Sequence, residues 1–188
     1  MSNETARLNG YRKQKNYDAF FTGKGIDIGC GGDILSEKVF ENVVQIDPYD
    51  LAQGDANYCS NIGDNAYDFV YSSHCLEHMN DPYVTFNNWL RICKPNGYMI
   101  HAVPHELFYE KCNWPSRYNG DHKTSWTLEW KSNLPKTIHT PYFLKFFEPQ
   151  METVSVETIL QNFDFTKFQT DQTLGIGTCQ IEFVGKKR

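Results

Sequence analysis

Two short segments hold the residues whose types and spacing could do chemistry. In residues 25–33 an apolar run ends at Asp27 and is followed by closely spaced glycines at 29, 31 and 32. Such a pattern predicts a buried strand that breaks into a tight turn, where the main chain can approach a ligand that a Cβ would exclude. In residues 43–47 a second apolar run ends in Asp47, whose carboxylate could hold a ribose diol through two hydrogen bonds. Together the segments predict a nucleoside-containing cofactor at the carboxyl ends of adjacent parallel strands.

Three histidines are candidates for a general base, because a neutral imidazole can take a proton at neutral pH. They are His74, just after the apolar run at 67–71, His105, just after the run at 98–103, and His122, in a polar turn that could also be an ordinary surface loop. A rival use of His74 is a metal site with Cys75 and His78. No fourth ligand is evident for it, so we predict no metal.

Composition and charge narrow the class of protein. The chain has 188 residues with 40% hydrophobic and 22% charged side chains, which is typical of one soluble globular domain. A net charge of −5 gives no positive field for polyanions, so nucleic acid is not the expected partner. The six cysteines form no CxxC pair, which favours a reducing compartment. With no signal-peptide pattern and no membrane-spanning run, we expect a cytoplasmic protein, as a monomer or homodimer.

The elements that must position the candidate residues alternate between strands and helices. Strands are expected at 25–28, 43–46, 67–71 and 98–103. Helices are expected within residues 1–22, packed on the edge of the sheet, from residue 33 onward, and from Asp81-Pro82, an N-cap followed by a first-turn proline. Residues 54–66 read as a loop. This alternation predicts an α/β fold with a doubly wound, mostly parallel sheet and a ligand at the strand carboxyl ends.

Residues 105–150 break the alternation. They are rich in proline and tryptophan, which predicts an insertion after the strand at 98–103 rather than another strand–helix unit. Inserts over this edge commonly form a lid or a substrate wall. A helix at 152–162 and strands at 165–170 and 179–185 are expected to close a single domain spanning residues 1–188.

In their order and spacing the motifs resemble those of class I S-adenosylmethionine-dependent methyltransferases over residues 20–104. Asp27-Ile28-Gly29-Cys30-Gly31 is similar to the family's first motif, and Asp47 falls at its ribose-binding acid. Gly54-Asp55-Ala56 resembles the adenine-contacting segment. Residues 71–78 resemble the exit of the family's fourth strand in its small-molecule branch, and residues 94–98 resemble the turn before the fifth strand. The resemblance implies a Rossmann-like methyltransferase fold with S-adenosylmethionine held by Asp27, Gly29, Cys30, Gly31, Asp47, Pro48, Asp55, Ala56, Ser72 and His74.

One residue departs from the pattern. The family often has a third glycine two residues after Gly31, where this chain has Asp33. We expect Gly32 to keep the turn permissive and Asp33 to cap the helix that follows.

The resemblance implies transfer of a methyl group to an oxygen or nitrogen of a small polar acceptor, with His105, His122 or His74 as the base. Residues 114–124 resemble inserts of methyltransferases found with surface-polysaccharide biosynthesis, so a sugar or sugar nucleotide is the expected acceptor. Arg117 and Lys123 could then meet phosphates or carboxylates, and Trp114 or Tyr118 could stack on a sugar. The motif of adenine-N6 methyltransferases is absent, which again argues against nucleic acid.

Two alternatives remain open at the level of sequence. A nicotinamide-dependent oxidoreductase shares the glycine turn and the acid after the second strand, although its fingerprint needs a glycine where Ile34 stands. A non-catalytic protein that only binds an adenosyl cofactor would keep the same binding residues.

Overall fold

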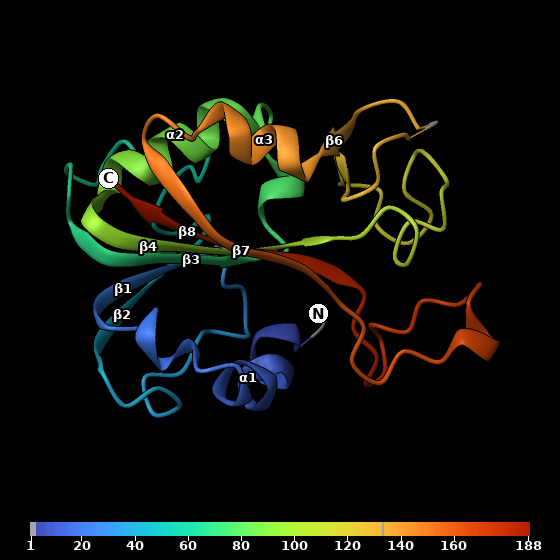
Figure 1. Ribbon diagram of the computed structural model, residues 1–188, viewed down its shortest axis with the longest axis horizontal. Helices are drawn as coiled ribbons and strands as arrows, with labels where there is room; N and C mark the ends of the chain where they lie inside the picture. Colours follow the sequence, from blue (N-terminus) through green and yellow to red (C-terminus); the bar gives the residue numbers. More distant parts are fainter. Residues whose placement is uncertain (1–2, 133) are drawn as a thin grey trace.

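The computed structural model describes residues 3–132 and 134–188, and its centre is a six-stranded sheet (Figure 1). The strands lie in the order β2 (Val43–Tyr49), β1 (Gly23–Ile28), β3 (Tyr67–Ser73), β4 (Cys93–Pro104), β8 (Gln180–Lys187) and β7 (Met151–Ile159). The first four are parallel, β8 runs antiparallel to β4, and β7 antiparallel to β8. The mostly parallel α/β sheet predicted from the sequence is therefore confirmed, and residues 54–66 form the predicted loop.

Helices cover both faces of the sheet (Figure 1). The helix α1 (Glu4–Gln14) lies on one face, and α2 (Pro82–Ile92) and α3 (Thr140–Phe146) lie on the other. Because successive strand side chains point to opposite faces, Val70 packs in the apolar cluster under α2 and α3, whereas Phe69 and Tyr71 pack in the cluster on the other side. The described residues also form short 3₁₀ helices at η1 (Tyr17–Ala19), η2 (Leu76–His78) and η3 (Phe165–Lys167).

The helix α2 begins as the sequence predicts. The side chain of Asp81 accepts hydrogen bonds from the main-chain N–H groups of Tyr83 at 2.9 Å and Val84 at 3.2 Å, and Pro82 occupies the first turn. These bonds satisfy two donors that a helix start leaves free. The helix fixes the segment just before it, which includes η2 and part of the site.

The helix α1 covers the face of the sheet rather than its edge, which corrects the prediction. Its Arg12 is fully buried and forms an ion pair with Glu182 of β8 at 2.5 Å. The guanidinium also lies 5.1 Å from the centre of the Tyr71 ring in β3. A buried cation needs such partners, so this pairing places α1 across the middle strands, with its first residues at their carboxyl ends.

The helix predicted from residue 33 does not form, and residues 31–40 are turns and irregular chain. The Asp33 carboxylate instead accepts hydrogen bonds from Thr5 N at 2.7 Å and Ala6 N at 3.2 Å, so it caps the distant start of α1. The N–H of Leu35 is held by the Asp27 carboxylate at 2.7 Å. Contacts between distant segments thus replace the local helical bonds, while Leu35 and Phe40 still bury their side chains.

The predictions for residues 152–170 are also wrong. Residues 151–159 form the edge strand β7 instead of a helix, and 165–167 form η3 instead of a strand. The β-branched residues between 153 and 159 favour a strand, and β8, the predicted strand at 179–185, supplies the ladder that completes it. The side chain of Asp164 accepts from Thr166 N at 2.9 Å and starts η3.

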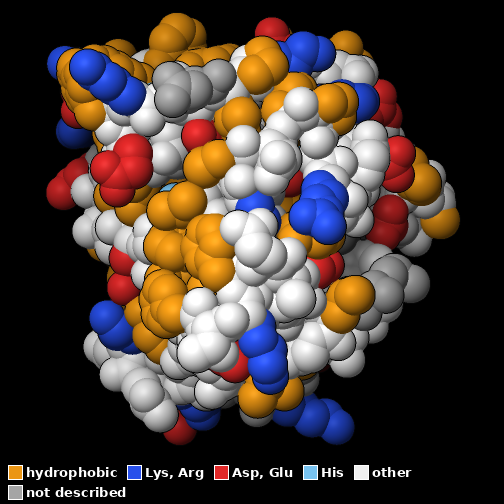
Figure 2. Space-filling model, turned by 90° about the vertical axis from the view of Figure 1, so that its right-hand side faces the viewer, with side chains coloured by type: hydrophobic (Ala, Val, Ile, Leu, Met, Phe, Trp, Pro, Cys, Tyr) orange, Lys and Arg blue, Asp and Glu red, His pale blue; other side chains and the backbone are white. Residues whose placement is uncertain are grey.

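Residues 105–150, the segment predicted as an insertion, contain two different kinds of structure. Residues 105–139 form loops with the two short strands β5 (Ser125–Thr127) and β6 (Thr137–His139), but α3 belongs to the core, where Phe143 and Phe147 pack against Phe86 of α2. This end of the molecule, shared with residues 160–179, exposes hydrophobic side chains (Figure 2). Among the described residues, no helix combines the length and apolar character that crossing a bilayer requires.

Candidate active site

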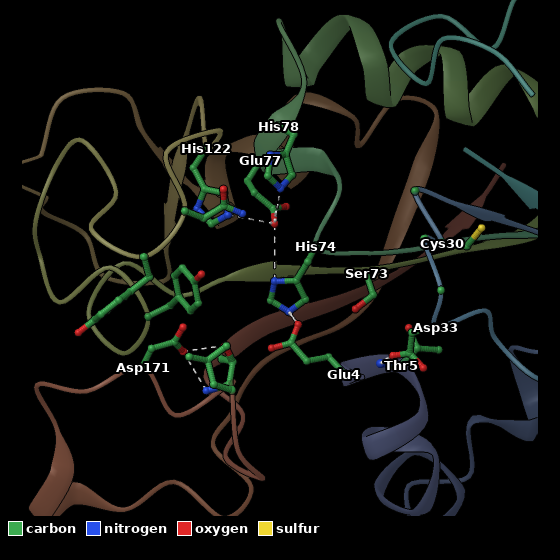
Figure 3. Close-up of a pocket in the computed structure, with 18 of the residues that line it drawn as sticks. Glu4, Thr5, Cys30, Asp33, Ser73, His74, Glu77, His78, His122 and Asp171 are labelled. Atoms are coloured by element: carbon green, nitrogen blue, oxygen red, sulfur yellow. Dashed lines mark hydrogen bonds and ion pairs between the residues drawn. The ribbon is translucent and has the colours of Figure 1, made fainter. Parts of the chain in front are cut away.

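A cavity of about 350 Å³ lies beyond the carboxyl ends of β1 and β3 (Figure 3). That size is in the range of small-ligand pockets. Its lining comes from five separate parts of the chain: the start of α1, the turn at 29–33, residues 73–78, and two loops around residues 109–122 and 171–174. The last of these loops was not anticipated from the sequence.

The glycine turn after β1 is built for close approach. Gly29 and Gly31 have φ of +74° and +52°, and a Cβ on Gly29 would lie 2.4 Å from Cys75 Sγ. A Cβ on Gly32 would meet nothing within 4 Å. Gly29, Cys30 and Gly31 line the cavity. The turn therefore presents main chain to a ligand on one side and packs tightly on β3's exit on the other.

Asp27 also lines the cavity, at the end of β1. Its side chain is almost fully buried, and one carboxylate oxygen accepts the N–H of Leu35. Burial raises the pKa of Asp27 from 3.8 to about 7. Near neutral pH this carboxyl group is therefore close to half ionised.

The structure does not bring Asp47 to the glycine turn. Its carboxylate is bound by Lys24 Nζ at 2.8 Å and Tyr67 Oη at 2.9 Å, which belong to the first residues of β1 and β3. These two residues lie at the amino-terminal ends of their strands, whereas the glycine turn follows the carboxyl end of β1. Desolvation opposes ionisation, but these partners hold the pKa of Asp47 below its usual range. Pro48 is exposed and does not line the cavity.

Asp50, three residues further, is the acid that meets the turn. Its Oδ2 accepts the N–H of Gly31 at 2.8 Å, and its main-chain carbonyl accepts the N–H of Gly54 at 3.1 Å. Asp50 therefore joins the glycine turn to the Gly54-Asp55-Ala56 segment. Asp50 was not predicted as a site residue, because the apolar run that marks β2 ends before the strand does.

The Gly54-Asp55-Ala56 segment lies outside the cavity lining. The Asp55 carboxylate is exposed, and its bonds from Asn57 lower its pKa. The Ala56 carbonyl accepts the indole N–H of Trp89 in α2 at 2.8 Å, which anchors the segment.

Ser73, rather than Ser72, faces the cavity. Neighbouring strand residues point to opposite faces, and Ser72 is fully buried with its Oγ 2.8 Å from His101 Nδ1. Burial lowers the pKa of His101 to about 3, so this pair is neutral core structure. The Ser73 hydroxyl lines the cavity and makes no hydrogen bond among the described residues.

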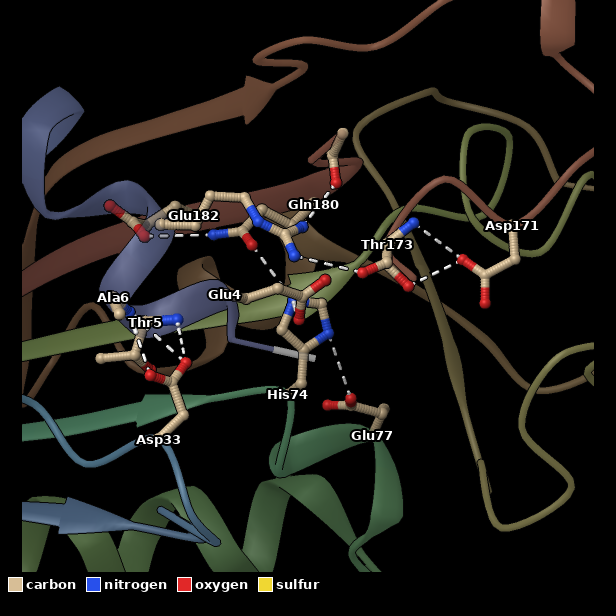
Figure 4. Close-up of polar contacts among 12 residues, drawn as sticks. Glu4, Thr5, Ala6, Asp33, His74, Glu77, Asp171, Thr173, Gln180 and Glu182 are labelled. Atoms are coloured by element: carbon tan, nitrogen blue, oxygen red, sulfur yellow. Dashed lines mark hydrogen bonds and ion pairs between the residues drawn. The ribbon is translucent and has the colours of Figure 1, made fainter. Parts of the chain in front are cut away.

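The His74 side chain lies between residues of α1, β8 and η2 (Figure 4). Its Nε2 lies 2.8 Å from Glu4 Oε2 and 3.1 Å from Gln180 Oε1, and its Nδ1 lies 3.6 Å from Glu77 Oε1. Burial opposes the positive charge, but Glu4 and Glu77 outweigh it and raise the pKa of His74 well above its ordinary value. A protonated imidazole cannot accept a proton, so this arrangement disfavours His74 as a base.

His105 does not line the cavity. It is buried beside Trp126 at the start of the 105–139 segment, and its Nδ1 accepts the N–H of Leu107 at 3.1 Å. Burial lowers the pKa of His105 to about 4. The structure gives this residue a role in shaping the loop.

His122 is the one candidate base with a free nitrogen at the cavity. Its Nδ1–H donates to Glu110 Oε1 at 2.6 Å, and its Nε2 faces Glu77 Oε1 at 3.8 Å. Main-chain N–H groups of Lys123 and Thr124 donate to the Glu77 carbonyl and dock the loop here. Glu77 and Glu110 were not predicted, because they meet His122 only through tertiary contacts.

Of the cationic and aromatic residues suggested to contact the acceptor, one lines the cavity and three do not. Tyr118 lines the cavity, but Trp114, Arg117 and Lys123 do not. Arg117 lies over the Tyr118 ring at 5.7 Å, and Lys123 Nζ donates to Asn80 at 2.6 Å. No Lys or Arg belongs to the cavity lining within residues 3–132 and 134–188.

Comparison with known proteins gives a family. The family model described as a methyltransferase domain matches residues 3–166. No curated protein matches the sequence.

Solved structures share the fold at low identity. One is a crystal structure titled as an S-adenosylmethionine-dependent methyltransferase from Listeria monocytogenes (15% identity, TM-score 0.59, covering 96% of this chain and 99% of that one). Another is the N-methyltransferase NodS from Bradyrhizobium japonicum WM9 in complex with S-adenosyl-L-homocysteine (10% identity, TM-score 0.62, covering 97% of this chain and 86% of that one). A third is the [4+2]-cyclase SpnF (15% identity, TM-score 0.60, covering 93% of this chain and 80% of that one). Its activity shows that this fold also hosts other chemistry.

Proposed function

The chain belongs to the methyltransferase domain family and is an S-adenosylmethionine-dependent methyltransferase; on that premise we propose that it methylates an oxygen or nitrogen of a small polar acceptor bound in the cavity. Family membership removes the oxidoreductase alternative. The observation that carries the proposal is that one cavity joins the glycine turn to His122 and Glu77.

The residues present fit the cofactor. Gly29 and Gly31 offer main chain to the methionine part, and the Ser73 hydroxyl, which makes no hydrogen bond among the described residues, is a proposed ligand contact. We propose that Asp50, which accepts the N–H of Gly31, binds the ribose in the role first assigned to Asp47. Asp55 and Ala56 remain the proposed adenine contacts. The cofactor supplies a methyl group activated by its sulfonium, and the protein has to exclude water and orient the acceptor.

The acceptor would lie against the two loops that close the cavity. Tyr109, Tyr118 and Asn119 come from the first loop, and Asp171 and Thr173 come from the second. The Tyr118 hydroxyl donates to the Gln169 carbonyl at 2.7 Å and joins the two. We propose that residues 105–139, with this second loop, form the lid over the acceptor, in place of the longer 105–150 segment.

The charged side chains that line the cavity limit which class of acceptor it can bind. Five carboxyl groups line the cavity (Glu4, Asp27, Asp33, Glu77 and Asp171), and no Lys or Arg does among the described residues. A phosphate would meet repulsion here, so the lining gives no support to the diphosphate of a sugar nucleotide. Hydroxyls and aromatic faces suit a neutral sugar or an amino sugar. We propose such an acceptor.

Cofactor binding tests the assignment of the two acids. Isothermal titration with S-adenosylhomocysteine compares wild type with Asp50→Asn and, as the matched control three residues earlier in the chain, Asp47→Asn. We expect about tenfold weaker binding for D50N, because a charge-assisted bond to the ribose is weakened, and a change below about threefold for D47N. Equal affinities in all three proteins would reject the role of Asp50.

Acceptor identity is tested with labelled cofactor and a panel of neutral sugars, amino sugars, sugar nucleotides and small amines, with products read by mass spectrometry. We expect label on a hydroxyl or amine of an uncharged or cationic compound. Label found only on sugar nucleotides would overturn the argument from charge, and label found only on nucleic acid or protein would overturn the small-molecule proposal.

A further inference from the structure

Three side chains on one wall of the cavity direct possible metal-ligand atoms at one space (Figure 3). Glu77 Oε1 lies 3.8 Å from His78 Nε2 and 3.8 Å from His122 Nε2, and the ligand atoms of the three residues all lie within 4.8 Å of one another. Zinc binds carboxylate oxygen and imidazole nitrogen at roughly 2.0–2.2 Å, which places neighbouring ligand atoms about 3.4 Å apart. Shifts of well under 1 Å per atom would close the cluster on an ion.

The far nitrogens of both imidazoles are already fixed. His122 Nδ1 is bound to Glu110 Oε1 at 2.6 Å, and His78 Nδ1 is bound to the Asp121 carbonyl at 3.2 Å. Metal-binding histidines almost always donate their second N–H to a carboxylate or a main-chain carbonyl, which sets the tautomer and leaves the other lone pair free. Both free lone pairs here belong to the Nε2 atoms that face Glu77.

Glu77 itself is ion-paired but makes no hydrogen bond among the described residues to compensate for its burial. The side chain is fully buried, and neither carboxylate oxygen makes a hydrogen bond among the described residues. A buried charge without a bonded partner is costly. The neighbouring imidazoles lie too far for hydrogen bonds, at 3.6 to 3.8 Å. An ion placed among them would satisfy the carboxylate and both lone pairs together.

We propose that Glu77, His78 and His122 bind a divalent first-row transition-metal ion. Two imidazoles and one carboxylate are typical ligands for zinc, iron, cobalt and manganese. Three protein ligands leave positions open toward the cavity, as in catalytic sites. This differs from the set His74, Cys75 and His78 considered from the sequence, because Cys75 Sγ lies under Gly29 and His74 Nε2 is bound to Glu4.

The consequence for the reaction rests on the proposed function. A divalent ion at this place lowers the pKa of a hydroxyl that ligates it, so it favours an oxygen acceptor. In the transfer, the oxygen lone pair forms the new C–O bond and the S–CH₃ bond breaks with its electrons left on sulfur. The hydroxyl proton passes to solvent. His122 then acts as a ligand and no separate base is required.

The test is metal binding by the whole chain after removal of metals with a chelator. Co²⁺ is added and followed by visible d–d absorption, and Zn²⁺ is added and followed by calorimetry. We expect one ion per chain with a Kd on the order of micromolar or tighter, and no thiolate charge-transfer band. The affinity should fall at least tenfold in His78→Gln, whose rim position makes loss of folding a small risk. The control His139→Gln removes an imidazole outside the cavity and should bind as wild type.

A second variant tests the hydrogen bond between Glu110 and His122, which lies outside the three proposed ligands. Glu110→Gln leaves the three ligands in place, and we expect Zn²⁺ affinity to fall about 10- to 100-fold. Zn²⁺ should raise the melting temperature of wild type and not that of H78Q. Absence of Co²⁺ and Zn²⁺ binding, or unchanged binding in H78Q, would overturn the proposal and leave the cluster an internal ion-pair network. S-adenosylhomocysteine binding is measured on the same samples, so failure of the metal site and failure of the cofactor site are told apart.

Discussion

The two sides of the cavity satisfy their buried charges in different ways. On the glycine-turn side (residues 27–33 and 50), the carboxylates of Asp27, Asp33 and Asp50 accept main-chain N–H groups from other segments. On the histidine side (residues 74–78, 110 and 122), carboxylates face imidazoles, and Glu77 makes no hydrogen bond among the described residues. The first side is complete without a ligand, and the second is not.

This difference matches the two tasks of a methyltransferase. A cofactor common to many enzymes is bound by fixed main chain, where glycine and hydrogen-bonded loops set the shape in advance. The acceptor and its proton need groups whose charge or coordination changes during the reaction. Variants that damage one side and spare the other therefore separate binding from chemistry.

The largest effect is expected from His122→Asn on the histidine side. Whether His122 accepts a proton or binds a metal, its loss should reduce kcat by about 10²- to 10⁴-fold. Affinity for S-adenosylhomocysteine should stay within about threefold, because the glycine turn is unchanged. Turnover is measured with labelled cofactor and binding by calorimetry. Parallel loss of both would show that the two sides do not act separately.

Gly29→Ala should have the largest effect on the glycine-turn side. The new Cβ would lie 2.4 Å from Cys75 Sγ at a residue with φ of +74°. We expect the free energy of unfolding to fall by about 2–3 kcal/mol and cofactor affinity to fall by about 100-fold. Gly32→Ala is the control, since its Cβ meets nothing within 4 Å, and it should change stability by less than about 0.5 kcal/mol. Similar losses in both variants, in denaturation and in titration, would contradict this account.

Asp27 should make stability depend on pH. Its pKa is about 7 in the folded protein and 3.8 ordinarily, so between these values the folded state binds more protons than the unfolded state. The free energy of unfolding therefore falls as pH rises, by about 2–3 kcal/mol between pH 5 and 8. Asp27→Asn should lose this slope, because its amide oxygen still accepts the Leu35 N–H and does not ionise. Urea denaturation of both proteins across that range measures the difference, and parallel curves would count against a raised pKa.

The smallest effect is expected from Asp33→Ala. This change removes the cap on the first turn of α1 and should cost about 1 kcal/mol of stability, with the histidine side unaffected. Ser36→Ala nearby is a control, since its Oγ makes only a local bond to Lys38 N at 3.4 Å. A neutral D33A variant in urea denaturation would mean that the distant cap contributes nothing.

Much of the fold could be predicted because its signals are local. The apolar runs at β1, β3 and β4 and the Asp81-Pro82 start of α2 each fix an element within a few residues. Predictions failed where a distant segment decided the outcome. Asp33 starts a different helix from the one expected, and the ladder with β8 makes residues 151–159 a strand.

The amino-acid sequence by itself determined the parallel strands, the glycine turn and the class of cofactor, because these depend on spacing between near neighbours. Only the tertiary structure decided which acid meets the turn and which histidine has a free nitrogen at the cavity. Asp47 and Asp50 are only three residues apart, yet Asp47 contacts the amino-terminal part of β1 and Asp50 contacts the glycine turn after its carboxyl end. Glu77, Glu110 and His122 come together only when the loop docks on η2, and no local pattern encodes that contact.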